Sequence, residues 1–295
     1  MSTVVTPAPP LVLLHASGMT SRQFARLTAA AEGTFTVTAP DLQGVGQTPL
    51  PDEAVQGPWT LDSEVRALLA LLSSLSAPAC VFGHSFGGLV AIEAALREPA
   101  RFAALCLYEP VIVSLMGSTG SAAARAEVAR IAELMAIPVD DDDDDDDDDG
   151  DRAGFSETWV RGFVDWWNGP GSFDRLPEAA RQQALDQALV SHRHVASMAL
   201  AHVSVDTLRT LTVKTHFMIG TTSPTAARES VQLASTTMPH ASLEVIDGAG
   251  HMGPLTHAAI VNERVLEFFR GKDGVGVDAT ERRSAARVPP SGPST

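Results

Sequence analysis

The chain contains 295 residues, of which 44% are hydrophobic, so it can bury a large core and is not expected to be disordered. Ten consecutive aspartates, Asp140–Asp149, contribute most of the net charge of −15, which would be −5 without them. The sequence has no basic stripe and no apolar run long enough to span a bilayer, which argues against nucleic acids and membranes as partners.

The ends of the chain and the acidic run are expected to be irregular. Residues 1–10 carry neither a basic residue nor an apolar signal-peptide segment, so we expect a flexible N-terminus and a cytoplasmic protein. The acidic run is expected to form a solvated, self-repelling loop at 140–151, because it lacks the spaced ligands and the glycine of a calcium loop. Residues 271–295, rich in Gly, Arg, Pro and Ser, are expected to be a disordered tail.

The two cysteines, Cys80 and Cys106, lie in short apolar runs, where small buried thiols are expected. The sequence has no disulfide framework and no spacing typical of metal ligands. We therefore predict neither a metal nor another cofactor.

Strands and helices are expected to alternate along the first 110 residues. Strands are predicted at 11–15, 36–40, 79–82 and 103–108, and helices at 21–31, 61–75 and 89–96. The predicted strands are continuous apolar runs, which is typical of strands that are buried on both faces. This pattern predicts an α/β fold with a doubly wound, mostly parallel sheet.

The pattern changes after Pro110. Helices without a clear strand are predicted at 122–135, 158–167 and 178–200, and the α/β alternation returns with strands at 213–220 and 242–246 and helices at 225–236 and 257–269. We therefore expect a core formed by 11–110 and 206–270, with an inserted helical cap at 111–205.

A candidate nucleophile lies in Gly83-His84-Ser85-Phe86-Gly87-Gly88, directly after a predicted strand. A G-x-S-x-G sequence at this place predicts a sharp turn from strand to helix that exposes the serine hydroxyl. The turn would also lie at the carboxyl ends of the strands, where open parallel sheets bind ligands. We therefore predict that Ser85 is a nucleophile.

A serine hydroxyl needs a base to remove its proton. Of the nine histidines, His251 has the most suggestive context, because it lies in a glycine-rich loop, Asp247–Pro254, after the last predicted strand. A serine followed far downstream by a histidine also matches the order of the α/β-hydrolase triad. His251 is our predicted general base.

Four segments together make the chain resemble the α/β-hydrolase superfamily, in its serine-nucleophile branch with a helical cap. They are His15-Ala16-Ser17-Gly18, which is similar to the oxyanion loop, Pro40–Thr48, which is similar to the family's PDLRGHGxS segment, the turn at 83–88, and Gly248–His251. The resemblance implies an oxyanion hole formed by the backbone N–H groups of Phe86 and Ser17. Ala16 stands where the family usually has glycine.

The third member of the expected triad departs from the family pattern. The family usually carries its acid after the strand that corresponds to 213–220, but Ser223 stands at that position. Some members carry the acid at the end of the strand after the nucleophile strand, so the resemblance implies Glu109. Asp247 is an alternative, although a loop aspartate more often bonds its own turn. A dyad assisted by Ser223 or water, or a catalytically weak protein, is also open.

These features predict a serine hydrolase that cleaves a small ester, lactone or thioester through an acyl-enzyme. The same fold also serves C–C hydrolases, hydroxynitrile lyases and cofactor-free peroxidases, and a small-molecule binding or sensory protein on this scaffold is a further alternative. Trp159, Trp166 and Trp167 would form either the core of the cap or an apolar wall above Ser85. The sequence specifies neither the substrate nor the oligomeric state.

Overall fold

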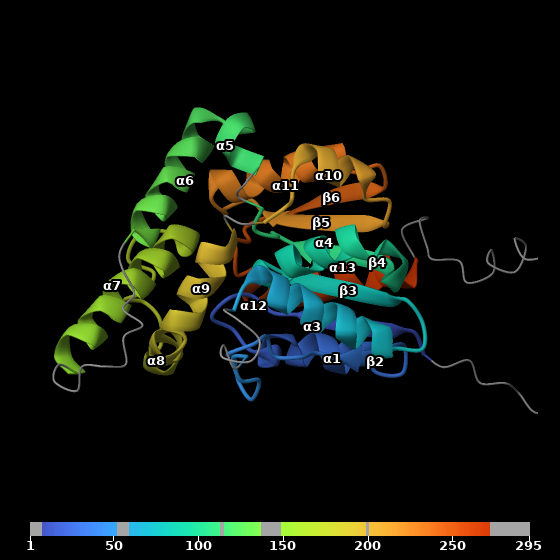
Figure 1. The fold of residues 1–295 in the computed structure, drawn as a ribbon, viewed down its shortest axis with the longest axis horizontal. Helices are drawn as coiled ribbons and strands as arrows, with labels where there is room; N and C mark the ends of the chain where they lie inside the picture. Colours follow the sequence, from blue (N-terminus) through green and yellow to red (C-terminus); the bar gives the residue numbers. More distant parts are fainter. Residues whose placement is uncertain (1–7, 52–58, 113–114, 137–148, 199–200, 272–295) are drawn as a thin grey trace, which may run out of the picture.

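The structure is a computed structural model that describes residues 8–51, 59–112, 115–136, 149–198 and 201–271. Its centre is a sheet of six parallel strands in the order β2-β1-β3-β4-β5-β6 (Figure 1). The strands are β1 (Pro10–Leu14), β2 (Thr36–Thr38), β3 (Ala79–His84), β4 (Phe102–Tyr108), β5 (Thr215–Gly220) and β6 (Ala241–Ile246). The sheet confirms the predicted doubly wound α/β fold.

Helices cover both faces of this sheet, because side chains along each central strand alternate between two hydrophobic cores. In β1, Val12 belongs to one core and Leu13 to the other. The first core includes residues of α3 (Leu61–Ser74), α4 (Phe86–Arg97) and α11 (Thr225–Thr237), and the second includes residues of α1 (Ala25–Ala31) and α13 (Ala258–Arg270). Short helical segments are η1 (Ser21–Phe24), η2 (Pro99–Arg101) and α12 (Gly253–Thr256).

Within the described residues, the segment between β4 and β5 contains helices and no strand. The helices are α5 (Met116–Thr119), α6 (Ala122–Met135), α7 (Asp149–Asn168), α8 (Glu178–Asp186), α9 (Ala188–Met198) and α10 (Val205–Thr210). In Figure 1, α6 to α9 stand together on one side of the sheet, whereas α10 lies among the helices that cover it. A helical insert was expected here, and the sheet continues after it.

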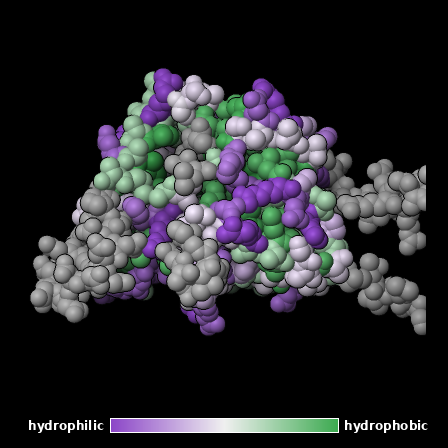
Figure 2. All heavy atoms as spheres, in the orientation of Figure 1, coloured by the Kyte–Doolittle hydropathy of each residue, from purple (hydrophilic) through white to green (hydrophobic). Residues whose placement is uncertain are grey.

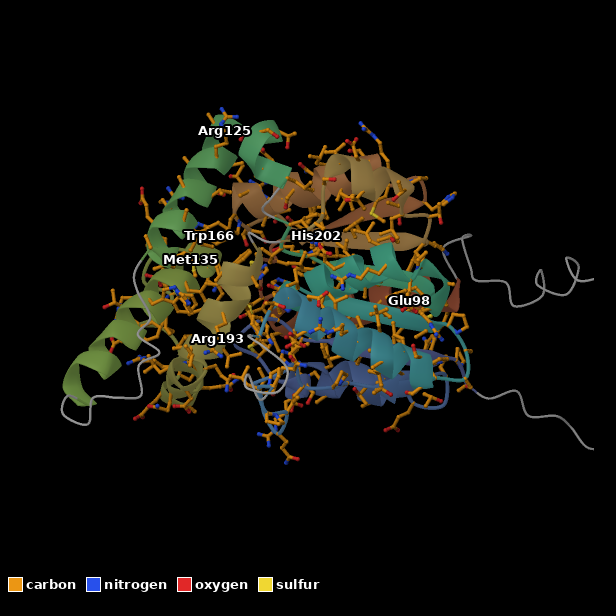
Figure 3. All side chains as sticks on the ribbon, viewed as in Figure 1. Glu98, Arg125, Met135, Trp166, Arg193 and His202 are labelled. Atoms are coloured by element: carbon orange, nitrogen blue, oxygen red, sulfur yellow. The ribbon has the colours of Figure 1, made fainter. Side chains whose placement is uncertain are left out.

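Polar contacts hold the insert together and join it to the core. Trp166 on α7 donates its indole N–H to the carbonyl oxygen of Glu127 on α6, at 3.0 Å. At the other end of the insert, the backbone N–H of His202 donates to the buried carboxylate of Glu93 on α4, at 2.6 Å. Figure 3 labels Trp166 within the insert and His202 at its end. The insert is therefore anchored to a helix that packs directly on the sheet.

The face of the molecule that Figure 2 draws carries both hydrophilic and hydrophobic residues. Hydrophilic residues form a band across the face drawn in Figure 2, with smaller hydrophobic areas between them. An exposed ion pair of Asp62 with Arg97 joins α3 to α4, and Asp62 also pairs with Arg66 one turn along α3. None of the described helices is both long and apolar enough to cross a membrane.

Several elements differ from the prediction in their bounds; α7, for example, begins at Asp149 and not at 158. The turn after β3 is tighter than expected, because the strand continues to His84 and α4 already begins at Phe86, which leaves Ser85 alone between them. The single helix expected at 178–200 is two helices, because Gln187 has a non-helical backbone between α8 and α9.

The predicted irregular segments lie mostly outside the described residues. This applies to 1–7 of the N-terminus, 140–148 of the acidic loop and 272–295 of the tail. Residues 149–151, at the end of the predicted acidic loop, belong to α7, and Pro10, at the end of the predicted flexible N-terminus, begins β1 because it pairs with Thr36. Cys80 and Cys106 are both buried thiols, as expected.

Candidate active site

Ser85 occupies a strained turn at the carboxyl end of β3. Its backbone has φ 56° and ψ −120°, a conformation that side-chain-bearing residues rarely adopt and that often marks functional sites. The neighbouring chain is too close for a side chain at Gly87, where a Cβ atom would lie 2.5 Å from the carbonyl oxygen of Leu14. The glycine of the predicted motif is therefore required by close packing of backbone on backbone.

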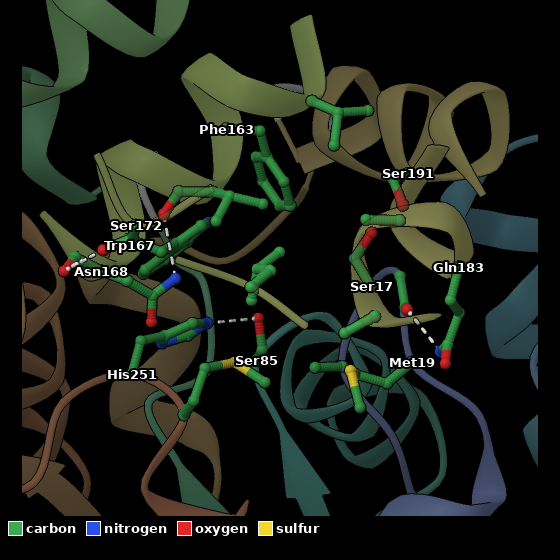
Figure 4. Close-up of a pocket in the computed structure, with 18 of the residues that line it drawn as sticks. Ser17, Met19, Ser85, Phe163, Trp167, Asn168, Ser172, Gln183, Ser191 and His251 are labelled. Atoms are coloured by element: carbon green, nitrogen blue, oxygen red, sulfur yellow. Dashed lines mark hydrogen bonds between the residues drawn. The ribbon is translucent and has the colours of Figure 1, made fainter. Parts of the chain in front are cut away.

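Ser85, His251 and Glu109 form a continuous line of hydrogen bonds. The Ser85 hydroxyl lies 2.9 Å from Nε2 of His251 (Figure 4), and Nδ1 of His251 lies 2.8 Å from Oε2 of Glu109. Because a carboxylate only accepts hydrogen bonds, Nδ1 carries the proton and Nε2 is left to accept from the serine. All three side chains are buried.

Glu109 follows β4 directly and its backbone also has a positive φ, 42°. Its second oxygen, Oε1, accepts from the backbone N–H of Gly220 at 2.7 Å and from the Ser223 hydroxyl at 2.5 Å. The buried carboxylate is thus satisfied on both oxygens, as a buried charge must be. Ser223, at the family's usual acid position, contacts Glu109 rather than replacing it.

The alternative acid, Asp247, lies elsewhere. Its side chain is exposed and accepts a hydrogen bond from Thr221 at 3.3 Å. The structure therefore brings Glu109, and not Asp247, to the imidazole of His251.

The two expected oxyanion donors are the N–H of Phe86, which follows Ser85 in the chain, and the N–H of Ser17, which lies in the loop after β1. Phe86 is the first residue of α4, so its N–H has no carbonyl partner one turn earlier within the helix. In the loop after β1, the N–H of Ala16 is occupied by Oε1 of Gln23 at 3.2 Å, whereas the N–H of Ser17 has no acceptor among the described residues. Ser17 also lines the same cavity as Ser85.

A buried relay of hydrogen bonds connects this loop to the histidine loop. Gln23 accepts from Ala16 and donates from Nε2 to Nδ1 of His84 at 2.9 Å, and Nε2 of His84 donates to the carbonyl oxygen of His251 at 2.8 Å. Burial lowers the pKa of His84 well below its ordinary value, so this ring is neutral. Sequence reasoning did not predict this connection, because Gln23 and His84 lie 61 positions apart in the chain.

A second contact that sequence reasoning missed comes from the insert. His194 of α9 places Nδ1 3.0 Å from the Ser17 hydroxyl and stacks on the Phe86 ring, with centroids 4.1 Å apart and planes 16° apart. Burial lowers the pKa of His194 to about 3, so the ring is neutral. One histidine of the insert therefore touches both residues that carry the expected oxyanion donors. Only the spatial neighbours of α9 could have indicated this.

The cavity above Ser85 has a volume of about 460 Å³ and is lined mainly by apolar side chains. In Figure 4, Trp167 lies above His251 on the left, Phe163 lies at the top, Met19 and Gln183 lie on the right, and Ser85 lies between the two sides. Trp159 also lines this cavity and is buried in the core, so it combines the two roles considered for the tryptophans. In the part of the chain that the structure describes, no cluster of three or more His, Cys, Asp or Glu could hold a metal ion.

Comparison with known proteins agrees with this fold. The model of the alpha/beta hydrolase family matches residues 11–264. Lipase LipV of Mycobacterium tuberculosis is 46% identical over 83 residues, which are 28% of this chain and 30% of LipV. A pimeloyl-[acyl-carrier protein] methyl ester esterase of Aromatoleum aromaticum is 39% identical over 99 residues, or 34% of this chain and 36% of the esterase. The matched regions thus span only about a third of these two relatives.

Among solved structures, the carboxylesterase CesB of Bacillus subtilis is similar over a larger part of the chain. It superposes with a TM-score of 0.63 over 88% of this chain and 83% of the esterase, at 20% sequence identity. At this identity the likeness concerns the fold alone.

Proposed function

The chain belongs to the alpha/beta hydrolase family, and we propose that it is a serine hydrolase that cleaves a small ester, lactone or thioester through an acyl-enzyme. The observation that carries the proposal is the unbroken line of hydrogen bonds from the Ser85 hydroxyl through His251 to Glu109. The relatives named lipase and methyl ester esterase support a carboxylic ester as the bond that is cleaved.

In the first half of the reaction, His251 Nε2 accepts the proton of the Ser85 hydroxyl as its oxygen attacks the acyl carbon. Glu109 holds the imidazole in the tautomer that can accept this proton and stabilises the imidazolium that forms. The imidazolium then donates the proton to the departing alcohol or thiol. In the second half, His251 takes a proton from water as the water oxygen attacks the acyl carbon. It then returns a proton to the Ser85 oxygen as the acyl–serine bond breaks and the acid leaves.

The negative charge on the substrate oxygen would be met by the N–H groups of Phe86 and Ser17. Removing one such donor typically costs on the order of 3 kcal/mol of transition-state stabilisation. The position of Phe86 at the start of α4 supports this role, because the N-terminus of a helix favours negative charge.

The cavity supports a substrate with an apolar acyl group. Its lining includes the aromatic side chains of Trp159, Phe163 and Trp167 and the aliphatic side chains of Val160 and Leu176. Burial of apolar surface against such a wall drives binding, and a few polar groups then orient the reacting bond.

Labelling with a fluorophosphonate probe tests the proposal. The wild-type protein should be labelled and should hydrolyse p-nitrophenyl esters of short to medium acyl chains, whereas Ser85→Ala should do neither. A folded wild-type protein that is not labelled would overturn the proposed nucleophile. Tight binding of ligands without turnover across a panel of esters, lactones and thioesters would instead favour a binding protein.

A further inference from the structure

Trp167 of α7 lies face to face with the imidazole of His251. The ring centroids are 3.5 Å apart and the planes differ by 16°. Both side chains are almost fully buried, with exposed fractions of 5% for Trp167 and 3% for His251. A residue of the helical insert thus covers one face of the proposed general base.

We propose that Trp167 is a positioning residue that stabilises the protonated imidazole of His251 through a cation–π contact. The inference rests on the proposed function, in which His251 becomes a cation when it takes the Ser85 proton. The face of an aromatic ring attracts a cation, and tryptophan does so most strongly when the cation lies within about 6 Å of the ring centroid. Burial strengthens the attraction, because little water competes for the charge.

The contact should act on the chemical step. A neutral imidazole gains less from the indole face than an imidazolium does, so the stack stabilises the transition state more than the ground state. An interaction of this kind raises kcat and leaves KM nearly unchanged. It also fixes the plane of the ring, and thereby keeps Nε2 in line with the Ser85 hydroxyl and Nδ1 in line with Glu109.

The other groups around the imidazole are compatible with this role. Glu109 and Ser85 bond its two nitrogens in the ring plane, which leaves the ring faces to other partners. The ring of His84 lies 5.1 Å away at an interplanar angle of 47°, and burial keeps the pKa of His84 so low that this ring carries no opposing charge. Trp167 is therefore the aromatic neighbour with the closest parallel contact among the described residues.

The tryptophan is itself held in place within the insert. Trp166 packs edge-on against it, with centroids 4.5 Å apart and planes at 85°, and the indole N–H of Trp166 is anchored on the carbonyl oxygen of Glu127. Phe163, one turn earlier on α7, also meets Trp167 edge-on at 6.5 Å. The stack on His251 therefore depends on the docking of α7, which couples the insert to the reaction centre.

The decisive experiment places mono-, di- and trifluorinated tryptophans at position 167 of the full chain by nonsense suppression. Fluorine withdraws electron density from the ring face but scarcely changes the size of the ring. We expect kcat for a p-nitrophenyl ester to fall with each added fluorine and to reach about a tenth of the wild-type value with the trifluorinated ring. KM should stay within about twofold of the wild-type value. Trp167→Phe should retain more activity than Trp167→Leu.

Fluorinated tryptophan at position 166 is the matched control, because Trp166 is the sequence neighbour and bonds Glu127 instead of stacking on His251. Among the fluorinated forms at 166, kcat should vary by less than about twofold and should not fall with each added fluorine, because His251 stacks on Trp167 and not on this ring. Equal kcat values for all fluorinated forms at 167, in an enzyme that loses activity with Ser85→Ala, would overturn this inference alone. Absence of any Ser85-dependent turnover in the wild type would overturn the proposed function and this inference with it.

Discussion

The hydroxyl of Ser223 donates a hydrogen bond of 2.5 Å to Oε1 of Glu109, and both side chains are buried. Ser223 stands where the family usually carries its acid, and it bonds the carboxylate of Glu109, which follows the neighbouring strand β4. Glu109 in turn bonds Nδ1 of His251 through its other oxygen, so we expect that the acid can be moved from position 109 to position 223.

Exchange of these residues should transfer the acid. Glu109→Ala should lower kcat by about 10³- to 10⁴-fold, because the imidazolium loses its counter-charge and its fixed tautomer. Adding Ser223→Asp to Glu109→Ala should recover at least about tenfold of this loss, since the new carboxylate would occupy the vacated space. Steady-state kinetics with one ester substrate measure both effects.

Asp247→Ala is the control for the acid, because Asp247 is exposed and bonds Thr221. Its kcat should remain within about twofold of wild type, as expected for an exposed residue outside the site. A loss with Asp247→Ala as large as that with Glu109→Ala would contradict the assignment of the acid.

The relay through Gln23 should couple the two loops beside Ser85. Gln23→Leu leaves the N–H of Ala16 and Nδ1 of His84 without their partner, and unsatisfied buried groups of this kind cost about 1–3 kcal/mol of folding stability each. We expect lower stability in urea denaturation and a lower kcat, because both loops lose a fixed support.

His84→Leu should have a related effect, and the double variant shows whether the two residues act together. A double-mutant cycle should give a loss smaller than the sum of the single losses, as expected for residues in one hydrogen-bond network. Additive losses in both stability and kcat would contradict the relay.

The hydrogen bond between Ser17 and His194 should orient the loop that carries the Ser17 N–H. Ser17→Ala removes the hydroxyl, and His194→Phe removes the ring nitrogen but keeps an aromatic ring to stack on Phe86. Each should lower kcat by roughly three- to tenfold, the value of one buried hydrogen bond, with less change in KM.

Because both substitutions delete the same bond, the double variant should lose little more activity than either single one. His194→Ala, which also deletes the stack, should lose more than His194→Phe. Unchanged kcat in Ser17→Ala would argue against a role for this bond.

Stability should depend on pH through Glu64. This carboxyl is buried on α3, and burial raises its pKa to about 7. Between the ordinary value of 4.5 and about 7, the folded chain holds a proton that the unfolded chain has lost. The contribution of Glu64 to stability is therefore fully present below pH 4.5, falls as the pH rises to about 7, and then stays low, with a total change of about 3 kcal/mol.

Glu64→Gln should remove this dependence, because an amide oxygen can still accept from the N–H of Gln43 and the indole of Trp59. Relative to wild type, the variant should gain stability in urea denaturation when the pH is raised from 5 to 8. Glu98→Gln, at an exposed site, is the control and should show no such trend. A stability difference between Glu64→Gln and wild type that is equal at both pH values would contradict the prediction.

The sequence by itself determined the fold and the position of the turn at Ser85. Continuous apolar runs alternating with helical periodicity are local signals, and they predict the parallel sheet that the structure has. The turn was also readable, because a G-x-S-x-G sequence directly after a predicted strand is typical of it. These features depend on residues that are close together in the chain, so they can be predicted without knowing which distant segments come into contact.

Contacts between distant segments were decided only by the tertiary structure. Glu109 and Asp247 each follow a strand, so the sequence places both at the carboxyl edge of the sheet. In the structure, the backbone of Glu109 at φ 42° and the hydrogen bonds that its carboxylate accepts from Gly220 and Ser223 direct it to His251. The stack of Trp167 on His251 required the docking of α7 over the strand ends. The apolar periodicity of a helix indicates which face is buried, but it does not indicate against which residue that face packs.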